Sequence, residues 1–205
     1  MLLKIYPENP DPRKMNQILT CLQRGGVIVY PTDTIYSIGC DLSHHKAFQR
    51  VAQLKGVKPE KANLSIICQD LSMLAHYSKN VSTPIYKLMK RALPGPYTFI
   101  LNASSEVPKL FKSNKKTVGI RVPDNPIARL IAGNLNGGLI ATSVHNDDEI
   151  LEYITDPELI HEKYKDQVDI VIDGGFGQNL ASTVIDCTSE TPEVIREGAG
   201  DVNII

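Results

Sequence analysis

Hydroxyl and acidic side chains follow directly after an apolar run near the start of this chain. Residues 27–30 read Val-Ile-Val-Tyr, and Pro31 is followed at once by Thr32, Asp33 and Thr34. Proline has no backbone N–H, so a central strand must stop or kink at Pro31. Open α/β sheets bind ligands at the ends of buried strands. The segment therefore predicts either a binding site or a turn in which Thr32 and Asp33 bond their own backbone.

Similar polar side chains recur at the ends of other expected strands. Thr142 and Ser143 end the apolar run 139–143, and Ser182 begins the run 182–186. Because side chains from several strand ends can meet at one edge of a sheet, this repetition favours the binding site over the simple turn.

Two arginines need anionic partners. Arg121 lies in the apolar run 117–122, and a buried guanidinium is seldom left without an anion. That anion is either an aspartate such as Asp33, in a structural ion pair, or the carboxylate or phosphate of a ligand. Arg196 raises the same question, with its neighbour Glu197 as a competing partner.

Phosphate-binding signals are weaker. Lys55 and Lys58 lie in a predicted loop that suits phosphates, although loop lysines are usually just solvated. The chain has no GxxxxGK[ST] loop and no GxGxxG motif after a strand. Residues 174–177 read Gly-Gly-Phe-Gly and are expected to form a turn between two strands. A bound nucleotide would therefore be held by side chains from several elements.

The bulk composition indicates one globular domain spanning residues 1–205, with 42% hydrophobic and 22% charged residues. No apolar stretch reaches the roughly 18 residues of a membrane span, and the short apolar start lacks a signal-peptide pattern. We therefore expect a cytoplasmic protein with no membrane contact.

The four scattered cysteines are expected to be free, mostly buried thiols. No metal site is expected, because the adjacent His44 and His45 point to different faces.

Charge is unevenly distributed along the chain, although its net value is −1. Residues 123–205 contain sixteen acids and four bases. Residues 87–121 contain one acid, Glu106, and eight bases: Lys87, Lys90, Arg91, Lys109, Lys112, Lys115, Lys116 and Arg121. A basic face can attract the phosphates of a nucleotide or of RNA, whereas a solvated surface with balanced charges is the more common case.

Hydrophobic periodicity predicts the elements that position these residues. Gly25 and Gly26 are expected to end the first helix, and Asp70 to open the third. Helices are expected at 12–24, 46–54, 71–77, 85–91, 126–135 and 156–165. Strands are expected at 27–30, 64–68, 97–102, 117–122, 139–143, 168–172, 182–186 and 193–196. Early alternation of helices and strands with a strand-rich end predicts a twisted mixed sheet flanked by helices, in one α/β domain.

Five short motifs, in their order and spacing, resemble the YrdC/YciO family. They are Pro-Thr-Asp-Thr-Ile-Tyr at 31–36, Pro-Gly-Pro-Tyr-Thr-Phe at 94–99, Gly-Ile-Arg-Val-Pro at 119–123, Ser-Thr-Val-Ile-Asp at 182–186 and Arg-Glu-Gly at 196–198. The stretch 168–201 is similar to the YciO branch in particular. The resemblance implies a YrdC-like fold over nearly the whole chain, with a concave, positively lined face linked to double-stranded RNA.

For its catalytic members, the resemblance implies synthesis of L-threonylcarbamoyladenylate from L-threonine, bicarbonate and ATP with Mg²⁺, releasing pyrophosphate. The product feeds threonylcarbamoyladenosine formation in tRNA. By matching position, threonine would be held by Thr34, Arg121 and Ser182. ATP would be held by Lys55, Lys58, Thr117, Ser143 and Arg196. No catalytic nucleophile is required, because positioning and charge stabilisation bring the anions together.

The chain departs from the family pattern at three places. A Lys-x-Arg-Pro loop becomes Lys-Gly-Val-Lys-Pro at 55–59, so a lysine without a bidentate fork replaces an arginine. A Ser-Ala-Asn motif becomes Ser-Val-His-Asn at 143–146, and Ser37 replaces a glycine. The altered loop and the basic segment 87–121 favour an alternative: a protein of the same fold that binds double-stranded RNA, tRNA or the ribosome without synthase activity.

Overall fold

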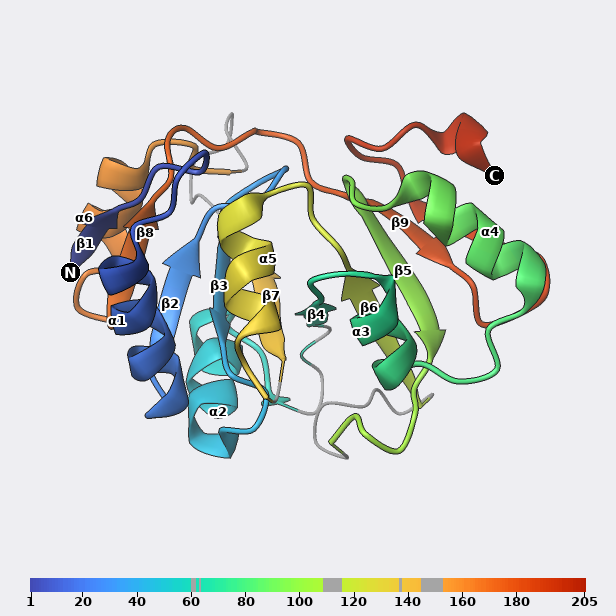
Figure 1. The fold of residues 1–205 in the computed structure, drawn as a ribbon, viewed down its shortest axis with the longest axis horizontal. Helices are drawn as coiled ribbons and strands as arrows, with labels where there is room; N and C mark the ends of the chain where they lie inside the picture. The colour runs from blue at the N-terminus through green and yellow to red at the C-terminus, as the bar shows by residue number, and fades with distance from the viewer. Residues whose placement is uncertain (60–61, 63, 109–115, 137, 145–152) are drawn as a thin grey trace.

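A computed structural model of the chain describes residues 1–59, 62, 64–108, 116–136, 138–144 and 153–205 (Figure 1). In these residues, six α-helices pack around a ten-stranded mixed sheet. The strand order along the sheet is β1-β8-β2-β3-β7-β4-β6-β5-β9-β10. The predicted single α/β domain, with a mixed sheet flanked by helices, is confirmed.

The predicted elements are present, with ends that shift by at most two residues. The helices are α1 (Pro12–Gln23), α2 (His45–Leu54), α3 (Leu71–Tyr77), α4 (Thr83–Ala92), α5 (Pro126–Gly133) and α6 (Pro157–Tyr164). The strands are β1 (Leu2–Lys4), β2 (Val27–Tyr30), β3 (Ser37–Cys40), β4 (Ser65–Ile67), β5 (Tyr97–Asn102), β6 (Thr117–Arg121), β7 (Leu139–Ser143), β8 (Ile170–Asp173), β9 (Thr183–Asp186) and β10 (Glu193–Arg196). A short 3₁₀ helix, η2 (Val202–Ile204), lies near the C-terminus.

Two strands, β1 and β3, were not predicted. β3 pairs antiparallel with β2, so residues 31–36 form the connection of a hairpin. Gly39 in β3 weakens the strand signal in the sequence. The fold nevertheless requires glycine there, because a Cβ at Gly39 would overlap the carbonyl oxygen of Ile140.

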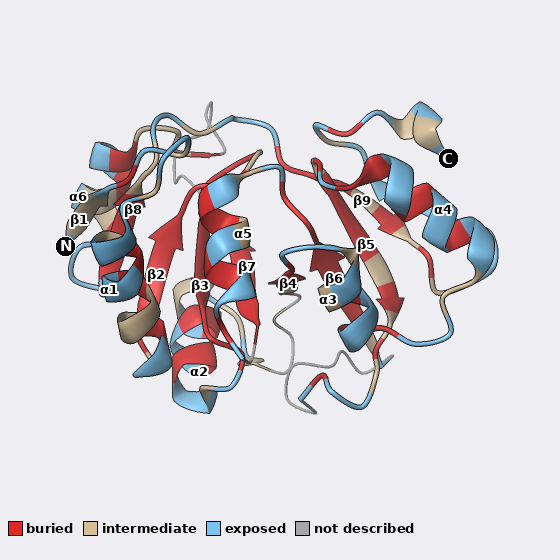
Figure 2. Ribbon diagram, viewed as in Figure 1, coloured by how far each residue is buried: buried red, intermediate tan, exposed pale blue. Residues whose placement is uncertain are grey.

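The sheet buries apolar side chains on both faces. On one face, Ile18 of α1 and Ile131 of α5 pack with Tyr30 of β2 in one apolar cluster. On the other, Phe48 of α2 and Leu88 of α4 belong to a larger cluster that also includes residues of α3 and α6. Figure 2 shows the buried strands behind helices whose outer sides are exposed. No helix in the described ranges is long and apolar enough to cross a membrane.

One face of the sheet around β6 is only partly covered. Along β6, Val118 and Ile120 are buried, whereas Thr117 and Gly119 are partly exposed. Alternate residues of a strand point to opposite faces, so Thr117, Gly119 and Arg121 share the less covered side. β9 shows the same alternation of burial, and β5 shows it from Phe99 to Asn102. We call this side of β4, β6, β5 and β9 the open face.

Candidate functional site

The hairpin connection between β2 and β3 holds Thr34 in a fixed position. Thr32 Oγ1 accepts a hydrogen bond from Thr34 N at 3.1 Å and donates to the carbonyl oxygen of Ile35 at 2.8 Å. The predicted turn is therefore present at Thr32, whereas the prediction that Asp33 also bonds its own backbone is wrong, because Asp33 Oδ1 accepts from Arg121 and Oδ2 has no partner in the described residues. The two threonine hydroxyls lie 3.1 Å apart, and Thr34 is fully buried. The turn therefore fixes the side chain of Thr34, which is one of the predicted site residues.

The connection between β8 and β9 also forms hydrogen bonds with this hairpin connection. Residues 174–182 connect β8 to β9, and the chain bends within the stretch predicted as a turn at Gly175, which has φ +93°. Gln178 N donates to the carbonyl oxygen of Thr34 at 2.8 Å, and Tyr36 Oη donates to that of Gly175 at 2.6 Å. The backbone of Thr34 is therefore held from both sides.

Arg121, at the end of β6, joins this turn to the open face. Its Nη2 donates to Asp33 Oδ1 at 2.8 Å and to Thr34 Oγ1 at 3.0 Å. β2 and β3 are separated from β6 by β7 and β4 in the sheet, so the hairpin connection reaches across two strands. The Arg121–Asp33 ion pair considered from the sequence is confirmed, and Arg121 also contacts Thr34.

This ion pair leaves polar atoms without partners. The side chains of Arg121 and Asp33 are only 6% and 9% exposed. Arg121 Nε and Asp33 Oδ2 nevertheless make no hydrogen bond to the described residues. Burial lowers the pKa of Arg121, and Asp33 opposes that shift. Buried polar atoms are rarely left unpaired, so the two atoms mark a position where a polar ligand would be stabilised.

Ser182, just before β9, is the centre of a second hydrogen-bonded group. Its Oγ lies 2.8 Å from Thr98 Oγ1 of β5. Arg196 of β10 donates to the carbonyl oxygen of Ser182 through Nε at 3.2 Å and through Nη2 at 2.8 Å. Glu197, the competing partner considered for Arg196, forms no ion pair with it in the described ranges. Arg196 is thus anchored beside Ser182 rather than neutralised by an acid.

Arg196 lies within electrostatic reach of two other cations, Lys55 and Arg121. Burial lowers the pKa of Lys55 at the end of α2, and the positive charge of Arg196 lowers it further. Arg196 also contributes to the lowered pKa of Arg121, after the larger effect of burial. Arg196 therefore lies close enough to both Lys55 and Arg121 to affect their ionisation. Such a group of cations would be stabilised by a bound anion.

The other residues predicted to bind ATP are Thr117, Ser143 and Lys58. Thr117 begins β6 on the same face as Arg121, four residues away along the strand. Ser143 pairs with Ser37 of β3 at the end of β7. Lys58 is exposed and makes no hydrogen bond or ion pair within the described residues. His145 and Asn146, which complete the altered Ser143 motif, lie outside the residues that the structure describes.

Sequence reasoning missed two polar residues of the open face. A Cβ at Gly119 would lie 3.0 Å from Ser65 Oγ of β4 and 3.5 Å from a methyl carbon of Thr98, so both side chains adjoin the glycine. The sequence signal for Ser65 and Thr98 was a polar residue within an otherwise apolar strand. The two side chains come together because β4 and β5 both pair with β6.

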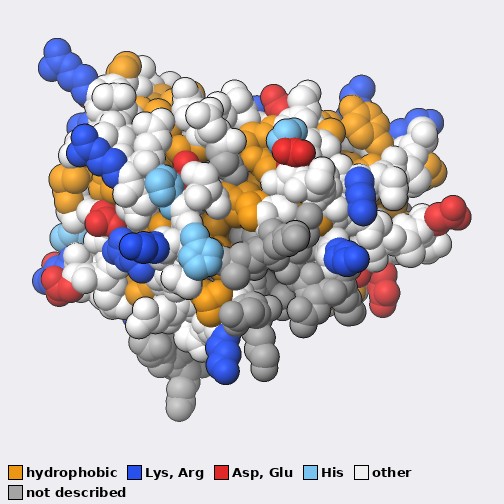
Figure 3. Space-filling model, turned by 90° about the horizontal axis from the view of Figure 1, so that it is seen from below, with side chains coloured by type: hydrophobic (Ala, Val, Ile, Leu, Met, Phe, Trp, Pro, Cys, Tyr) orange, Lys and Arg blue, Asp and Glu red, His pale blue; other side chains and the backbone are white. Residues whose placement is uncertain are grey.

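The basic segment 87–121 does not form one continuous surface in the described structure. Lys87, Lys90 and Arg91 lie on α4, and the Arg121 side chain is buried. Lys109, Lys112 and Lys115 lie outside the described residues. Figure 3 shows one face of the molecule, where Lys and Arg side chains are scattered between acidic and uncharged ones.

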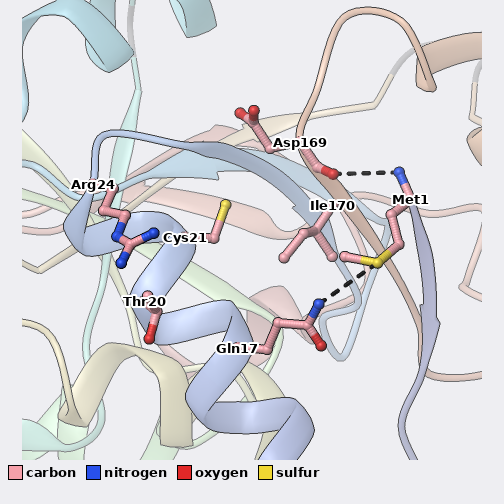
Figure 4. Close-up of a pocket in the computed structure, with 7 residues that line it drawn as sticks. All are labelled: Met1, Gln17, Thr20, Cys21, Arg24, Asp169 and Ile170. Carbon is pink, nitrogen blue, oxygen red and sulfur yellow. Dashed lines mark hydrogen bonds between the residues drawn. The ribbon is translucent and has the colours of Figure 1, made fainter.

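A separate pocket of about 380 Å³ lies near the N-terminus (Figure 4). Its lining residues are Met1, Gln17, Thr20, Cys21, Arg24, Asp169 and Ile170, and they include none of the predicted site residues. Burial and the charge of Asp169 raise the pKa of the Cys21 thiol, which disfavours the reactive thiolate. All four cysteines are free, as predicted, and three of them are buried. The pocket is therefore not the predicted threonine or ATP site.

Comparison with known proteins gives matches over almost the whole chain. The family model Sua5_yciO_yrdC, described as telomere recombination, matches residues 20–198. "Uncharacterized protein YciO" of Escherichia coli K12 is 42% identical over 200 residues, which cover 97% of this chain and 95% of that protein. The crystal structure of E. coli YciO matches with a TM-score of 0.91 at 40% identity, over 100% of this chain and 98% of that one.

More distant relatives carry names that refer to a reaction or a ligand. A threonylcarbamoyl-AMP synthase of Coxiella burnetii is 28% identical over 186 residues, 90% of this chain and 97% of that protein. The crystal structure of P. abyssi Sua5 complexed with L-threonine matches with a TM-score of 0.86 at 25% identity, over 97% of this chain but 57% of that one. The fold, the family model and the identity to YciO agree: the chain belongs to the Sua5/YciO/YrdC family.

Proposed function

We propose that this protein binds L-threonine and ATP at the open face and synthesises L-threonylcarbamoyladenylate, which serves tRNA threonylcarbamoyladenosine formation. The observation that carries the proposal is Arg121, a buried guanidinium whose Nε has no partner among the described residues, beside the hydroxyl of Thr34. The threonine complex of P. abyssi Sua5 and the synthase of C. burnetii support it as relatives.

In this proposal, Thr34, Arg121 and Ser182 hold threonine. Arg121 receives the carboxylate, because a guanidinium matches a carboxylate in charge and geometry. The hydroxyls of Thr34 and Ser182 would hydrogen-bond the polar groups of the amino acid. Their fixed positions reduce the entropy lost when the reactants are brought together.

ATP would be held next to threonine by Arg196, Lys55, Lys58, Thr117 and Ser143. The amine of threonine first combines with bicarbonate to give a carbamate and water. A carbamate oxygen then attacks the α-phosphorus, and the bond to pyrophosphate breaks. The carbamate and the triphosphate are both anionic, so the positive charges of Arg196 and Lys55 would offset their repulsion. Mg²⁺ prefers phosphate and water oxygens and would enter with ATP.

The reaction is tested by measuring pyrophosphate release with ATP, bicarbonate and Mg²⁺, in the presence and absence of L-threonine. We expect release that depends on threonine and falls when D-threonine replaces it, because the side-chain hydroxyl would then miss its partners. Absence of threonine-dependent release, under conditions where a family synthase works, would exclude the proposed reaction.

The alternative function, RNA binding without synthase activity, rests on the lysines and arginine of α4 and on the altered loop at 55–59. Binding to double-stranded RNA or tRNA should then weaken steeply with salt, because each phosphate contact releases counterions. No detectable binding at low salt would exclude this alternative.

A further inference from the structure

A β-bulge places the side chain of Arg196 on the open face. The register between β10 and β9 shifts between Val194 and Arg196, so Ile195 is an extra residue in the ladder. Arg196 therefore pairs with Val184, a partly exposed residue of the open face. Without the extra residue, Arg196 would point to the opposite face, because a slip of one residue turns a strand's side chains over. A bulge of this kind re-aims a side chain, and Arg196 depends on it.

The side chain of Thr183 holds the chain that follows Arg196. Thr183 is fully buried, and its Oγ1 accepts hydrogen bonds from Gly198 N at 2.9 Å and from Gly200 N at 3.0 Å. The same hydroxyl donates to the carbonyl oxygen of Gly200 at 2.6 Å. One donated and two accepted bonds use the full capacity of a hydroxyl group. A single side-chain oxygen therefore attaches both glycines to β9.

Close packing leaves residues 198–200 little freedom. A Cβ at Gly198 would overlap the carbonyl oxygen of Ala181, and a Cβ at Gly200 would overlap the ring of Tyr97. Ala199 N also donates to the carbonyl oxygen of Ala181 at 2.8 Å. The backbone of this segment therefore lies directly against the chain that enters β9 and against the start of β5.

The hydroxyl of Thr183 lies on the side of the sheet away from the open face. Its partner in β5 is Tyr97, which belongs to the larger apolar cluster. Neighbouring residues of a strand point to opposite faces, so Thr183 and Val184 lie on opposite sides of β9. Thr183 therefore acts on the open face only through the chain segments that it holds.

We propose that the hydroxyl of Thr183 is a positioning group for Arg196. By anchoring residues 198–200 it maintains the bulge and keeps the guanidinium against the carbonyl oxygen of Ser182, which accepts from Nε at 3.2 Å and from Nη2 at 2.8 Å. The kinetic consequence rests on the proposed function, in which Arg196 contacts ATP. Loss of the anchor frees the chain after Arg196 and lets the guanidinium leave its place beside Ser182.

The position of the guanidinium is tested without any substrate. The Nε–H of Arg196 is followed by ¹H–¹⁵N NMR, and its signal is assigned by its absence from Arg196→Lys. Thr183→Val keeps the shape of the side chain but removes the hydroxyl, and should speed exchange of this proton about fivefold or more, the loss of roughly one net hydrogen bond. Thr183→Ser keeps the hydroxyl and should restore slow exchange. Thr20→Val, on α1, is the matched control and should leave the exchange unchanged.

Steady-state kinetics supply the second measurement. Thr183→Val should raise the KM for ATP about fivefold to tenfold, while kcat and the KM for threonine change less than about twofold. Thr183→Ser should return the KM for ATP to within about twofold of the unaltered protein. In an Arg196→Ala background, Thr183→Val should have no further effect on this KM, because both substitutions act on the same guanidinium.

Unchanged exchange of the Arg196 proton in folded Thr183→Val would overturn the proposal. An equal rise of both KM values, or a further rise in the Arg196→Ala background, would also overturn it, because Thr183 would then support β9 as a whole. If Thr183→Val does not fold, Gly198→Ala displaces the same segment without touching Thr183 and must show the faster exchange for the proposal to stand.

Failure of this inference and failure of the proposed function give different results. The exchange measurement requires no turnover, so it tests the positioning of Arg196 even if the protein releases no pyrophosphate. Faster exchange with an unchanged KM for ATP would support the positioning role of Thr183 and would contradict the assignment of Arg196 to the ATP site.

Discussion

Replacing Arg121 with alanine should abolish threonine-dependent pyrophosphate release and also destabilise the fold. We expect at least a hundredfold loss of kcat/KM for threonine, because the substrate carboxylate loses its charged partner. The free energy of unfolding should fall by about 3–5 kcal/mol, because the buried Asp33 carboxylate is left without a counter-charge. Steady-state kinetics and urea unfolding measure the two effects.

The double variant Asp33→Ala/Arg121→Ala separates these two roles. Removing both charges eliminates the unpaired carboxylate, so the double variant should recover part of the stability lost in Arg121→Ala. It should recover none of the activity, because the site still lacks its guanidinium. Recovery of threonine-dependent turnover in the double variant would show that Arg121 supports the fold but does not bind the substrate.

Replacing Arg196 with alanine should weaken ATP binding with little effect on stability. Arg196 lies on the exposed strand β10, and its guanidinium donates two hydrogen bonds to the carbonyl oxygen of Ser182. Loss of a charge-assisted phosphate contact should raise the KM for ATP about tenfold or more. The free energy of unfolding should change by less than about 2 kcal/mol, since each of the two hydrogen bonds contributes about 1 kcal/mol net.

Two further variants of β10 test whether the charge and shape of Arg196 cause the change in the KM for ATP. Arg196→Lys keeps the charge without the bidentate fork, so its KM for ATP should lie between those of the unaltered protein and the alanine variant. Glu193→Ala, at the opposite end of β10, is the control and should leave the KM unchanged. An unaltered KM in Arg196→Ala would remove Arg196 from the ATP site.

The elements of the fold were largely predictable from hydrophobic periodicity. The helix α5 begins at Pro126 and α3 is capped by Asp70, whose carboxylate accepts from Met73 N at 2.9 Å, as their sequence signals indicate. β3 was missed because its glycine and serine resemble a loop. The short strand β1 was missed because three residues, Leu2–Lys4, are too few to show a period.

The site was only partly predictable, because the sequence shows residue types but not which strands lie side by side. It indicated that Arg121 requires an anion and offered Asp33 as one, and that ion pair is present. It could not indicate that one oxygen and one nitrogen of the pair stay unbonded, because this depends on side-chain geometry across four strands. The contact of Ser182 with Thr98 depends in the same way on the parallel pairing of β5 with β9.

The central claim, that the open face joins carboxylated threonine to the α-phosphate of ATP, is tested most directly by detecting the product. The protein would be incubated with ATP, Mg²⁺, L-threonine and ¹³C-bicarbonate, and the nucleotides analysed by mass spectrometry. The account predicts an adenylate that contains threonine and one ¹³C atom, formed only when all three substrates are present and absent with Arg121→Ala. Threonine binding at Arg121 without any labelled adenylate would contradict it.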